Sequence, residues 1–171
     1  MSQVNKDWAL YYASLGWAVF PLMPKTKRPA NEHGSSEATT DVATITQWWT
    51  QWPTANIGMC PAKSGLYALD VDPRNGGDKS FEALQTEHAG ALASPLMNLS
   101  GSGNGFHMLF RDKPDTKYKG QPAEGIDGKH KGFIVLPPSV HPHTNELYKW
   151  LGGTLPTAEL VASLDVAPAF L

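Results

Sequence analysis

The sequence predicts an α+β fold built on a mixed or antiparallel sheet. Short apolar runs of strand length follow one another from residue 56 to residue 136, with only one helical pattern between them. A doubly wound parallel sheet would instead alternate strands with helices throughout. Because 171 residues are enough to bury a sizeable core, we expect one domain over residues 1–171.

The N-terminal part should form a small α/β unit. Apolar residues recur at spacings of three and four in two segments, and Gly16 and Pro53 end them. Asp41 is suited to cap the second segment. The predicted elements are a helix over 8–15, a strand over 17–22 and a helix over 41–52, with a long connection before the second helix.

The remaining elements are mostly strands, because apolar runs of three to six residues are bounded by glycine, proline or polar turns. The prediction is neighbouring strands over 56–59 and 66–71, a helix over 79–91, strands over 97–99 and 106–110, an irregular segment over 112–124, a strand near Ile126, strands over 133–136 and 147–150, and a helix over 157–164.

Composition excludes several classes of protein. The formal net charge is −2 at pH 7. The chain therefore lacks the overall positive charge that is typical of a protein that binds nucleic acid strongly on its own. No uninterrupted apolar stretch approaches the ~18 residues of a membrane span, and the N-terminus is unlike a secretory signal. We therefore expect a cytoplasmic protein with no membrane partner. The single cysteine, Cys60, excludes an internal disulfide and a Cys-rich zinc site.

Two carboxylates close the apolar run that begins at Leu66. Asp70 and Asp72 are two positions apart, and side chains at that spacing on a strand share one face. Two anions so close together favour a hard divalent cation such as Mg²⁺ or Mn²⁺, which cancels their repulsion. The alternative is that both residues simply favour the turn that follows.

A second motif is the glycine-rich run that precedes His107. Alternate glycines leave backbone N–H groups free to face an anion such as a phosphate. It is not a P-loop, because no Gly-Lys-Ser/Thr follows and the run opens a strand. A flexible hairpin with a surface histidine is the alternative. The candidate nucleotide-binding residues here are Ser102, Gly103, Asn104, Gly105 and His107.

A third motif surrounds Asp127. This residue follows a short apolar segment, as Asp70 does, and could supply a third carboxylate to one pair of cations. An isolated aspartate before glycine is also a common turn residue. The nearby candidates for donors to phosphate oxygens are Lys129, Lys131, Ser139 and His141.

Basic residues concentrate between positions 111 and 131, which hold 6 of the 14 lysines and arginines. Such a loop suits contacts with a nucleic-acid backbone, and a merely solvated loop would look the same. The candidates for nucleic-acid contacts are Arg111, Lys113, Lys117, Lys119 and Lys131.

Taken in order, these motifs resemble the N-terminal domain of bifunctional DNA primase/polymerases, the prim-pol branch of the archaeo-eukaryotic primase superfamily. The resemblance covers roughly residues 8–160, and the motifs are specific as an ordered set. It is carried by residues 16–22, Lys27 with Pro29, Trp48-Trp49, Trp52-Pro53, residues 55–58, residues 69–73 with Gly76-Gly77, the run ending in His107, residues 125–127 and residues 137–142.

The resemblance implies an RRM-like catalytic sheet with the N-terminal α/β unit packed beside it. It places the family's acidic motifs on Asp70, Asp72 and Asp127, and its small-x-His motif on residues 105–107. After the third aspartate the family usually has a hydrophobic and then a basic residue, whereas this chain has Gly128 and then Lys129.

The implied activity is template-directed nucleotidyl transfer in a plasmid, phage or mobile-element replication system, with two Mg²⁺ or Mn²⁺ ions and no zinc. The implied partners are a single-stranded DNA template, a primer and nucleoside triphosphates. We expect a monomer that a helicase domain or helicase protein follows or assists.

Three other classes remain open. Asp-x-Asp also occurs in nucleotide-sugar glycosyltransferases, although the later motifs would then be unexplained. His141-Pro142-His143 with Tyr148 resembles metal-dependent nicking endonucleases, which share an RRM-like core. A non-catalytic nucleic-acid-binding module would make the acidic residues incidental.

Overall fold

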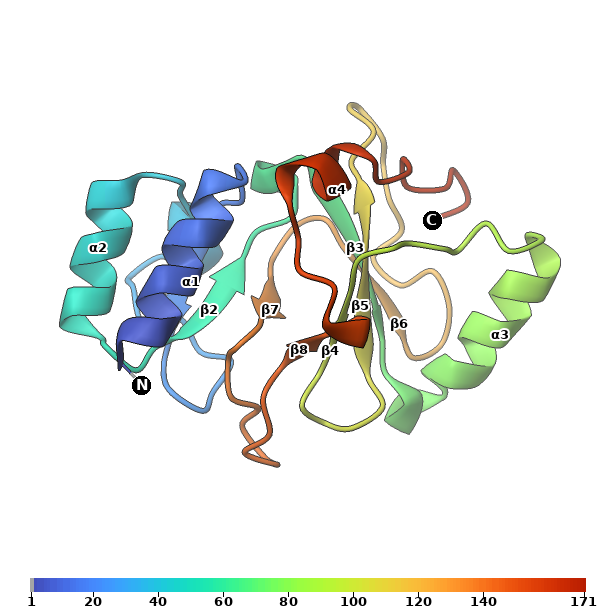
Figure 1. Ribbon diagram of the computed structural model, residues 1–171. Coiled ribbons are helices and arrows are strands. Elements are labelled where there is room, and N and C mark those ends of the chain that lie inside the picture. The colour runs from blue at the N-terminus through green and yellow to red at the C-terminus, as the bar shows by residue number, and fades with distance from the viewer. Residues whose placement is uncertain (1) are drawn as a thin grey trace.

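The computed structural model describes residues 2–171 and confirms an α+β architecture with antiparallel sheets (Figure 1). A three-stranded sheet has the order β1-β2-β7, and a five-stranded sheet has the order β6-β3-β5-β4-β8. The helices are α1 (Ser2–Ser14), α2 (Val42–Gln51), α3 (Gly77–Glu87) and α4 (Ala158–Ala162). The strands are β1 (Val19–Leu22), β2 (Asn56–Met59), β3 (Leu66–Val71), β4 (Met97–Leu99), β5 (Phe106–Arg111), β6 (Ile126–Lys129), β7 (Ile134–Leu136) and β8 (Lys149–Trp150).

The five-stranded sheet confirms the RRM-like prediction. Helix α3 joins β3 to β4, a hairpin joins β4 to β5, and β6 returns to the outside of β3. This is the strand order of a β-α-β-β-α-β unit, except that irregular chain between β5 and β6 replaces the second helix. Strand β8 extends the sheet beyond β4.

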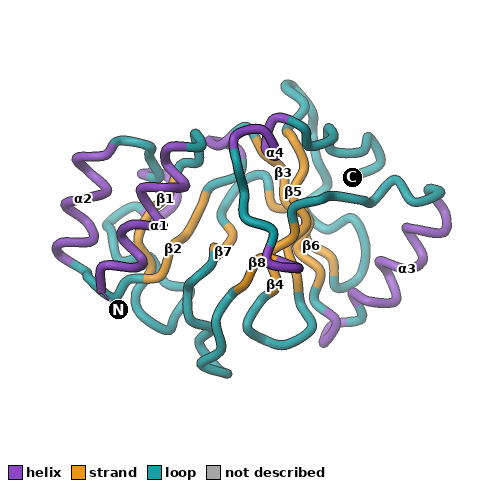
Figure 2. The backbone as a smooth tube through the Cα atoms, in the orientation of Figure 1, coloured by secondary structure: helices purple, strands orange, loops and turns teal. Residues whose placement is uncertain are grey.

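The two sheets share one hydrophobic core. Leu66 and Ala68 of β3, with Leu109 of β5, pack in one cluster with Tyr12 of α1 and Trp49 of α2. In Figure 2 both of these helices lie beside the three-stranded sheet, while α3 lies at the far side of the molecule. This face of the five-stranded sheet is therefore turned toward the N-terminal unit.

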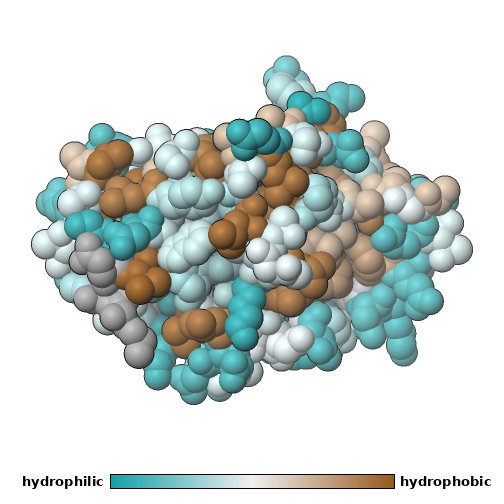
Figure 3. Space-filling model, in the orientation of Figure 1, coloured by the Kyte–Doolittle hydropathy of each residue, from teal (hydrophilic) through white to brown (hydrophobic). Residues whose placement is uncertain are grey.

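The opposite face of the five-stranded sheet packs against α3. Leu69, Met108 and Phe110 contact Phe81 and Leu84 of that helix in a second cluster. Strict alternation along β3 and β5 thus gives each strand two buried faces. The exposed surface mixes hydrophilic and apolar side chains on the face seen in Figure 3. Among residues 2–171, no helix is long and apolar enough to cross a membrane.

The structure corrects one strand pairing and the bounds of one helix that the sequence predicted. The strands over 56–59 and 66–71 are consecutive in the chain but lie in different sheets, because the 3₁₀ turn Ala62–Ser64 and the left-handed Gly65 redirect the chain between them. The helix expected over 79–91 begins at Gly77 and ends at Glu87. It ends early because Ala89 and Gly90 adopt φ values of 49° and 79°, outside the helical region.

Candidate active site

Four polar side chains form one row across the five-stranded sheet. Asp70 on β3 lies opposite Asp127 on β6 and opposite His107 on β5, and Asn98 on β4 lies opposite His107. Residues directly opposite on neighbouring strands project from the same face, with Cβ atoms about 4.5–5.5 Å apart. The row therefore faces the N-terminal unit, as Ala68 and Leu109 do on the same strands.

Asp72 is brought to this row by a tight contact between two glycines. The N–H of Asp72 donates to the Gly125 carbonyl at 2.8 Å, and the N–H of Gly77 donates to the Asp72 carbonyl at 3.0 Å. A Cβ on Gly77 would lie 2.3 Å from the Gly125 oxygen, and Gly125 itself adopts φ +67°. Only glycine fits both positions, so the turn after β3 can lie directly against the start of β6.

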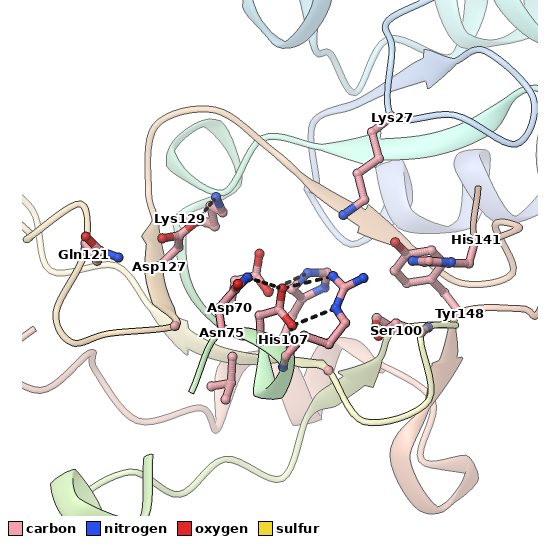
Figure 4. A pocket seen from close by; sticks show the side chains of 16 residues that line it. Lys27, Asp70, Asn75, Ser100, His107, Gln121, Asp127, Lys129, His141 and Tyr148 are labelled. Carbon is pink, nitrogen blue, oxygen red and sulfur yellow. Dashed lines mark hydrogen bonds and ion pairs between the residues drawn. The ribbon is translucent and has the colours of Figure 1, made fainter. Parts of the chain in front are cut away.

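The row borders a cavity of about 340 Å³ between the two units. Figure 4 shows Lys27 reaching into it from the segment after β1, opposite Asp70 and Asp127, with His141 and Tyr148 at another side. The cavity therefore draws side chains from both units of the fold. It is lined by Lys27, Asp70, Val71, Asp72, Arg74, Asn75, Ser100, Ser102, Gly105, His107, Gln121, Gly125, Asp127, Lys129, His141 and Tyr148.

Two of the three carboxylates are paired with cations. Asp72 accepts from Arg74 Nε at 3.0 Å, Arg74 Nη2 at 2.9 Å and Asn75 Nδ2 at 3.0 Å. These bonds, Arg74 first, hold the pKa of Asp72 below its usual value. Asp127 accepts from Lys129 Nζ at 2.8 Å. Within residues 2–171, no three acidic, histidine or cysteine side chains already converge as ligands around one point.

His107 is buried and its ring has a defined orientation. Asn98 Nδ2 lies 2.6 Å from the Val135 carbonyl oxygen, which can only accept, so this atom is the amide nitrogen. The same nitrogen lies 3.1 Å from Nδ1 of His107 and donates to it. Burial lowers the pKa of His107, so the neutral ring carries its proton on Nε2.

The Nε2–H group of His107 faces the acidic row. It lies 3.5 Å from Oδ1 of Asp70, and the Tyr148 ring stacks near the imidazole at a centroid distance of 6.3 Å. A neutral N–H donor at this point can bind a phosphate oxygen without carrying a charge of its own.

The structure brings together most of the residues that the sequence predicted for one site. Eight of them line the cavity: Asp70, Asp72, Ser102, Gly105, His107, Asp127, Lys129 and His141.

Three of the predicted nucleotide-binding residues lie elsewhere. The hydroxyl of Ser139 is fully buried and accepts the Ile57 N–H at 2.8 Å. Asn104 lines an adjoining hollow with Asp72 and Asp78. The N–H of Gly103 donates within its own loop, to the Ser100 carbonyl at 3.3 Å.

The five residues predicted to contact nucleic acid do not line the cavity, although Gln121 and Lys129 of the same segment do. Arg111 Nε donates to the Leu164 carbonyl, and the N–H of Lys119 donates to the Leu171 carbonyl. Both contacts tie the loop to the C-terminal segment. None of Arg111, Lys113, Lys117, Lys119 and Lys131 is among the cavity's described lining residues.

Among the residues that the sequence did not assign to this site are Lys27, Arg74 and Tyr148, which line the cavity, and Asn98, which supports His107. Lys27 approaches the acidic row only through packing of the two units. Arg74 resembles an ordinary turn residue. Asn98 alone gives a signal, because a polar residue between Met97 and Leu99 in so short a strand must point to the other face.

The RRM-like sheet, with an acidic row on the face that is turned toward the N-terminal unit, defines a primase-type α+β domain. The family model for "Bifunctional DNA primase/polymerase, N-terminal" matches residues 9–164, and the chain belongs to this family. No curated protein matches the chain.

Proposed function

We propose that this chain is the catalytic domain of a DNA primase/polymerase, which transfers nucleotides to a primer under the direction of a DNA template. The proposal extends to replication of a plasmid, phage or other mobile element. The observation that carries it is the row of Asp127, Asp70 and His107, with Asp72 beside it, on a cavity that also contains lysine and arginine.

The carboxylates fit a pair of divalent cations. Asp70 and Asp127 lie directly opposite each other on neighbouring strands, and like charges so placed destabilise the apo protein. Carboxylate oxygens are the ligands that Mg²⁺ and Mn²⁺ prefer. Asp70, Asp72 and Asp127 would hold two such ions, which would supply activation of a hydroxyl for attack on the α-phosphate and charge neutralisation of the leaving pyrophosphate.

The other lining residues suit the triphosphate. His107 offers its Nε2–H from a fixed ring, and Lys129 and Lys27 offer ammonium groups. Hydrogen bonds from such groups stabilise negative charge as it moves to the leaving phosphates. Arg74 and Lys129 neutralise Asp72 and Asp127 while no cation is bound, and both side chains can turn to phosphate once the carboxylates bind metal.

We propose a single-stranded template and a primer as macromolecular partners, and a helicase domain or protein as a further one. We propose that the domain acts as a monomer.

Primer extension tests the proposal. Wild type should lengthen a labelled primer with Mg²⁺ or Mn²⁺, and Asp70→Asn, Asp72→Asn and Asp127→Asn should each abolish extension while the protein stays folded. Mn²⁺ should raise the melting temperature of wild type but not of these variants, since only a protein that binds the ion is stabilised by it. Asp7→Asn, on the exposed surface of α1, is the matched control and should behave as wild type. Full activity of any one site variant would remove that residue from the site.

The alternatives predict other results. A nicking endonuclease would form a covalent adduct between Tyr148 and DNA, yet burial raises the pKa of Tyr148 to about 12, which opposes its use as a nucleophile. A glycosyltransferase would label a sugar acceptor, and a non-catalytic module would show no stabilisation by Mn²⁺.

A further inference from the structure

A second hollow adjoins the catalytic cavity and is lined by cations from both units of the fold. Its volume is about 570 Å³. It shares Lys27, Arg74 and His141 with the catalytic cavity, so the two spaces adjoin each other. We call it the basic groove, and define it by its lining: Lys25, Thr26, Lys27, Arg28, Arg74, His141, Pro142 and His143.

One wall of the basic groove is an ordered turn. The N–H of Met23 donates to the Arg28 carbonyl at 2.8 Å, and the N–H of Thr26 donates back to the Met23 carbonyl at 3.1 Å. The hydroxyl of Thr26 accepts the Arg28 N–H at 3.0 Å. Lys25, Lys27 and Arg28 therefore project, exposed, from a backbone that is already fixed.

The charge of the basic groove is of one sign. Its described lining contains four lysine and arginine residues and no aspartate or glutamate. The pKa of His141 is lowered, first by burial and then by the positive charges of Lys27, His143 and Arg74. The other hollow that shares Asp72, Arg74 and Ser102 with the cavity also contains Asp78. Of these two neighbours of the cavity, only the basic groove suits a polyanion.

We propose that the basic groove binds the phosphodiester backbone of a single nucleic-acid strand where that strand enters or leaves the catalytic cavity. This inference rests on the proposed function and deepens it. A strand that ends at the acidic row must pass out through an adjoining opening, and the donors for a triphosphate already lie inside the cavity. Contacts to backbone phosphates need no base recognition, as template-directed synthesis requires.

The basic groove therefore takes the role that the sequence assigned to the loop over residues 111–131. Binding of the strand in the groove and binding on the loop predict different effects for two double variants, each of which removes two positive charges. Lys25→Gln/Arg28→Gln removes two charges that line only the groove. Lys113→Gln/Lys117→Gln removes two exposed charges from the loop and is the matched control.

The experiment is fluorescence anisotropy of labelled oligothymidine with the whole chain over a series of salt concentrations, without metal or nucleotide. Each single-strand phosphate contact contributes about −0.7 to the slope of log affinity against log salt. Loss of two contacts should make the slope shallower by about 1.4 and lower the affinity about 25-fold near 0.1 M salt. The control variant should retain the wild-type slope.

Three outcomes would overturn the proposal. The salt dependence of DNA affinity could become shallower in the loop variant and stay at the wild-type slope in the groove variant. Both variants could bind as wild type does. The groove variant could instead lose affinity for Mn²⁺ and nucleotide with its DNA slope unchanged, which would assign the groove to a triphosphate.

Failure of the proposed function would look different. Because strand binding is measured without metal or nucleotide, a wild type that extends no primer would reject the polymerase and leave the groove result standing. Thermal melting checks that both variants remain folded.

Discussion

Asn98→Leu should separate the role of the buried amide in stability from its role in orienting His107. The amide nitrogen donates to the Val135 carbonyl at 2.6 Å and to His107 Nδ1 at 3.1 Å. Leucine leaves both acceptors without that donor, and each orphaned buried group costs about 1–3 kcal/mol. Part of this cost is recovered, because Oδ1 of Asn98 has no partner in the structure.

The net loss should be about 2–4 kcal/mol in the free energy of unfolding, which lowers the melting temperature by roughly 5–15 °C for a chain of this size. Urea denaturation measures the first quantity. Nitrogen chemical shifts of His107 should show its proton redistributing between Nδ1 and Nε2, and affinity for nucleotide should fall roughly tenfold, the equivalent of one lost hydrogen bond.

Asn56→Leu is the matched control. Asn56 is also buried and exchanges two hydrogen bonds with Val140, so its loss should destabilise the fold comparably while the His107 ring keeps its proton on Nε2. The reasoning about Asn98 is refuted if both variants leave the His107 shifts unchanged, or if Asn98→Leu melts within a degree or two of wild type.

Two further predictions concern pH and the glycine contact. Burial lowers the pKa of His107 in the folded state, so below the ordinary value of about 6.5 the unfolded chain binds more protons than the folded one. The free energy of unfolding should therefore be unaffected by this group above that pH and should decline as pH falls below it. The variant His107→Gln should show a smaller decline. A variant with the same pH profile as wild type would contradict this. Gly125→Ala should cost at least about 2 kcal/mol, because alanine is strained at φ +67° and its Cβ would lie 2.4 Å from the Gly77 nitrogen. Gly132→Ala, at φ +84° with open space around it, is the control. Mn²⁺ should raise the melting temperature less in Gly125→Ala than in Gly132→Ala, because the contact between Gly77 and Gly125 positions Asp72. An equal rise in both variants would show that this contact does not position Asp72.

Sequence patterns predicted the features that depend on local geometry. The period of two placed His107 on the face opposite Phe106, Met108 and Phe110, and the structure confirms it, with the latter two in the cluster against α3. The apolar runs located the strands of the RRM-like sheet to within a few residues. They could not show that β2 and β3 part into separate sheets, because the redirecting turn is only three residues long.

The parts of the site that escaped prediction depend on contacts between distant segments. Lys27 joins the cavity across more than forty positions of sequence from Asp70, and no spacing rule connects them. In the loop over residues 111–131, Arg111 and Lys119 bond to the C-terminal segment, whereas Gln121 and Lys129 line the cavity, and composition does not distinguish these two parts. Charge counts along a chain do not reveal which cations a fold gathers around one space.

The placement of Asp127, Asp70, His107 and Asn98 on four adjacent strands limits which mutations the domain can survive. Their mutual spacing is set by ladder hydrogen bonds, so substitutions elsewhere in the sheet leave it nearly unchanged. Deleting or inserting one residue within β5 or β6 would instead turn His107 or Asp127 toward α3 and exchange it for an apolar neighbour. Changes of length should therefore be confined to the irregular chain between β5 and β6 and to the other loops, while the strand lengths stay fixed among functional variants of this chain.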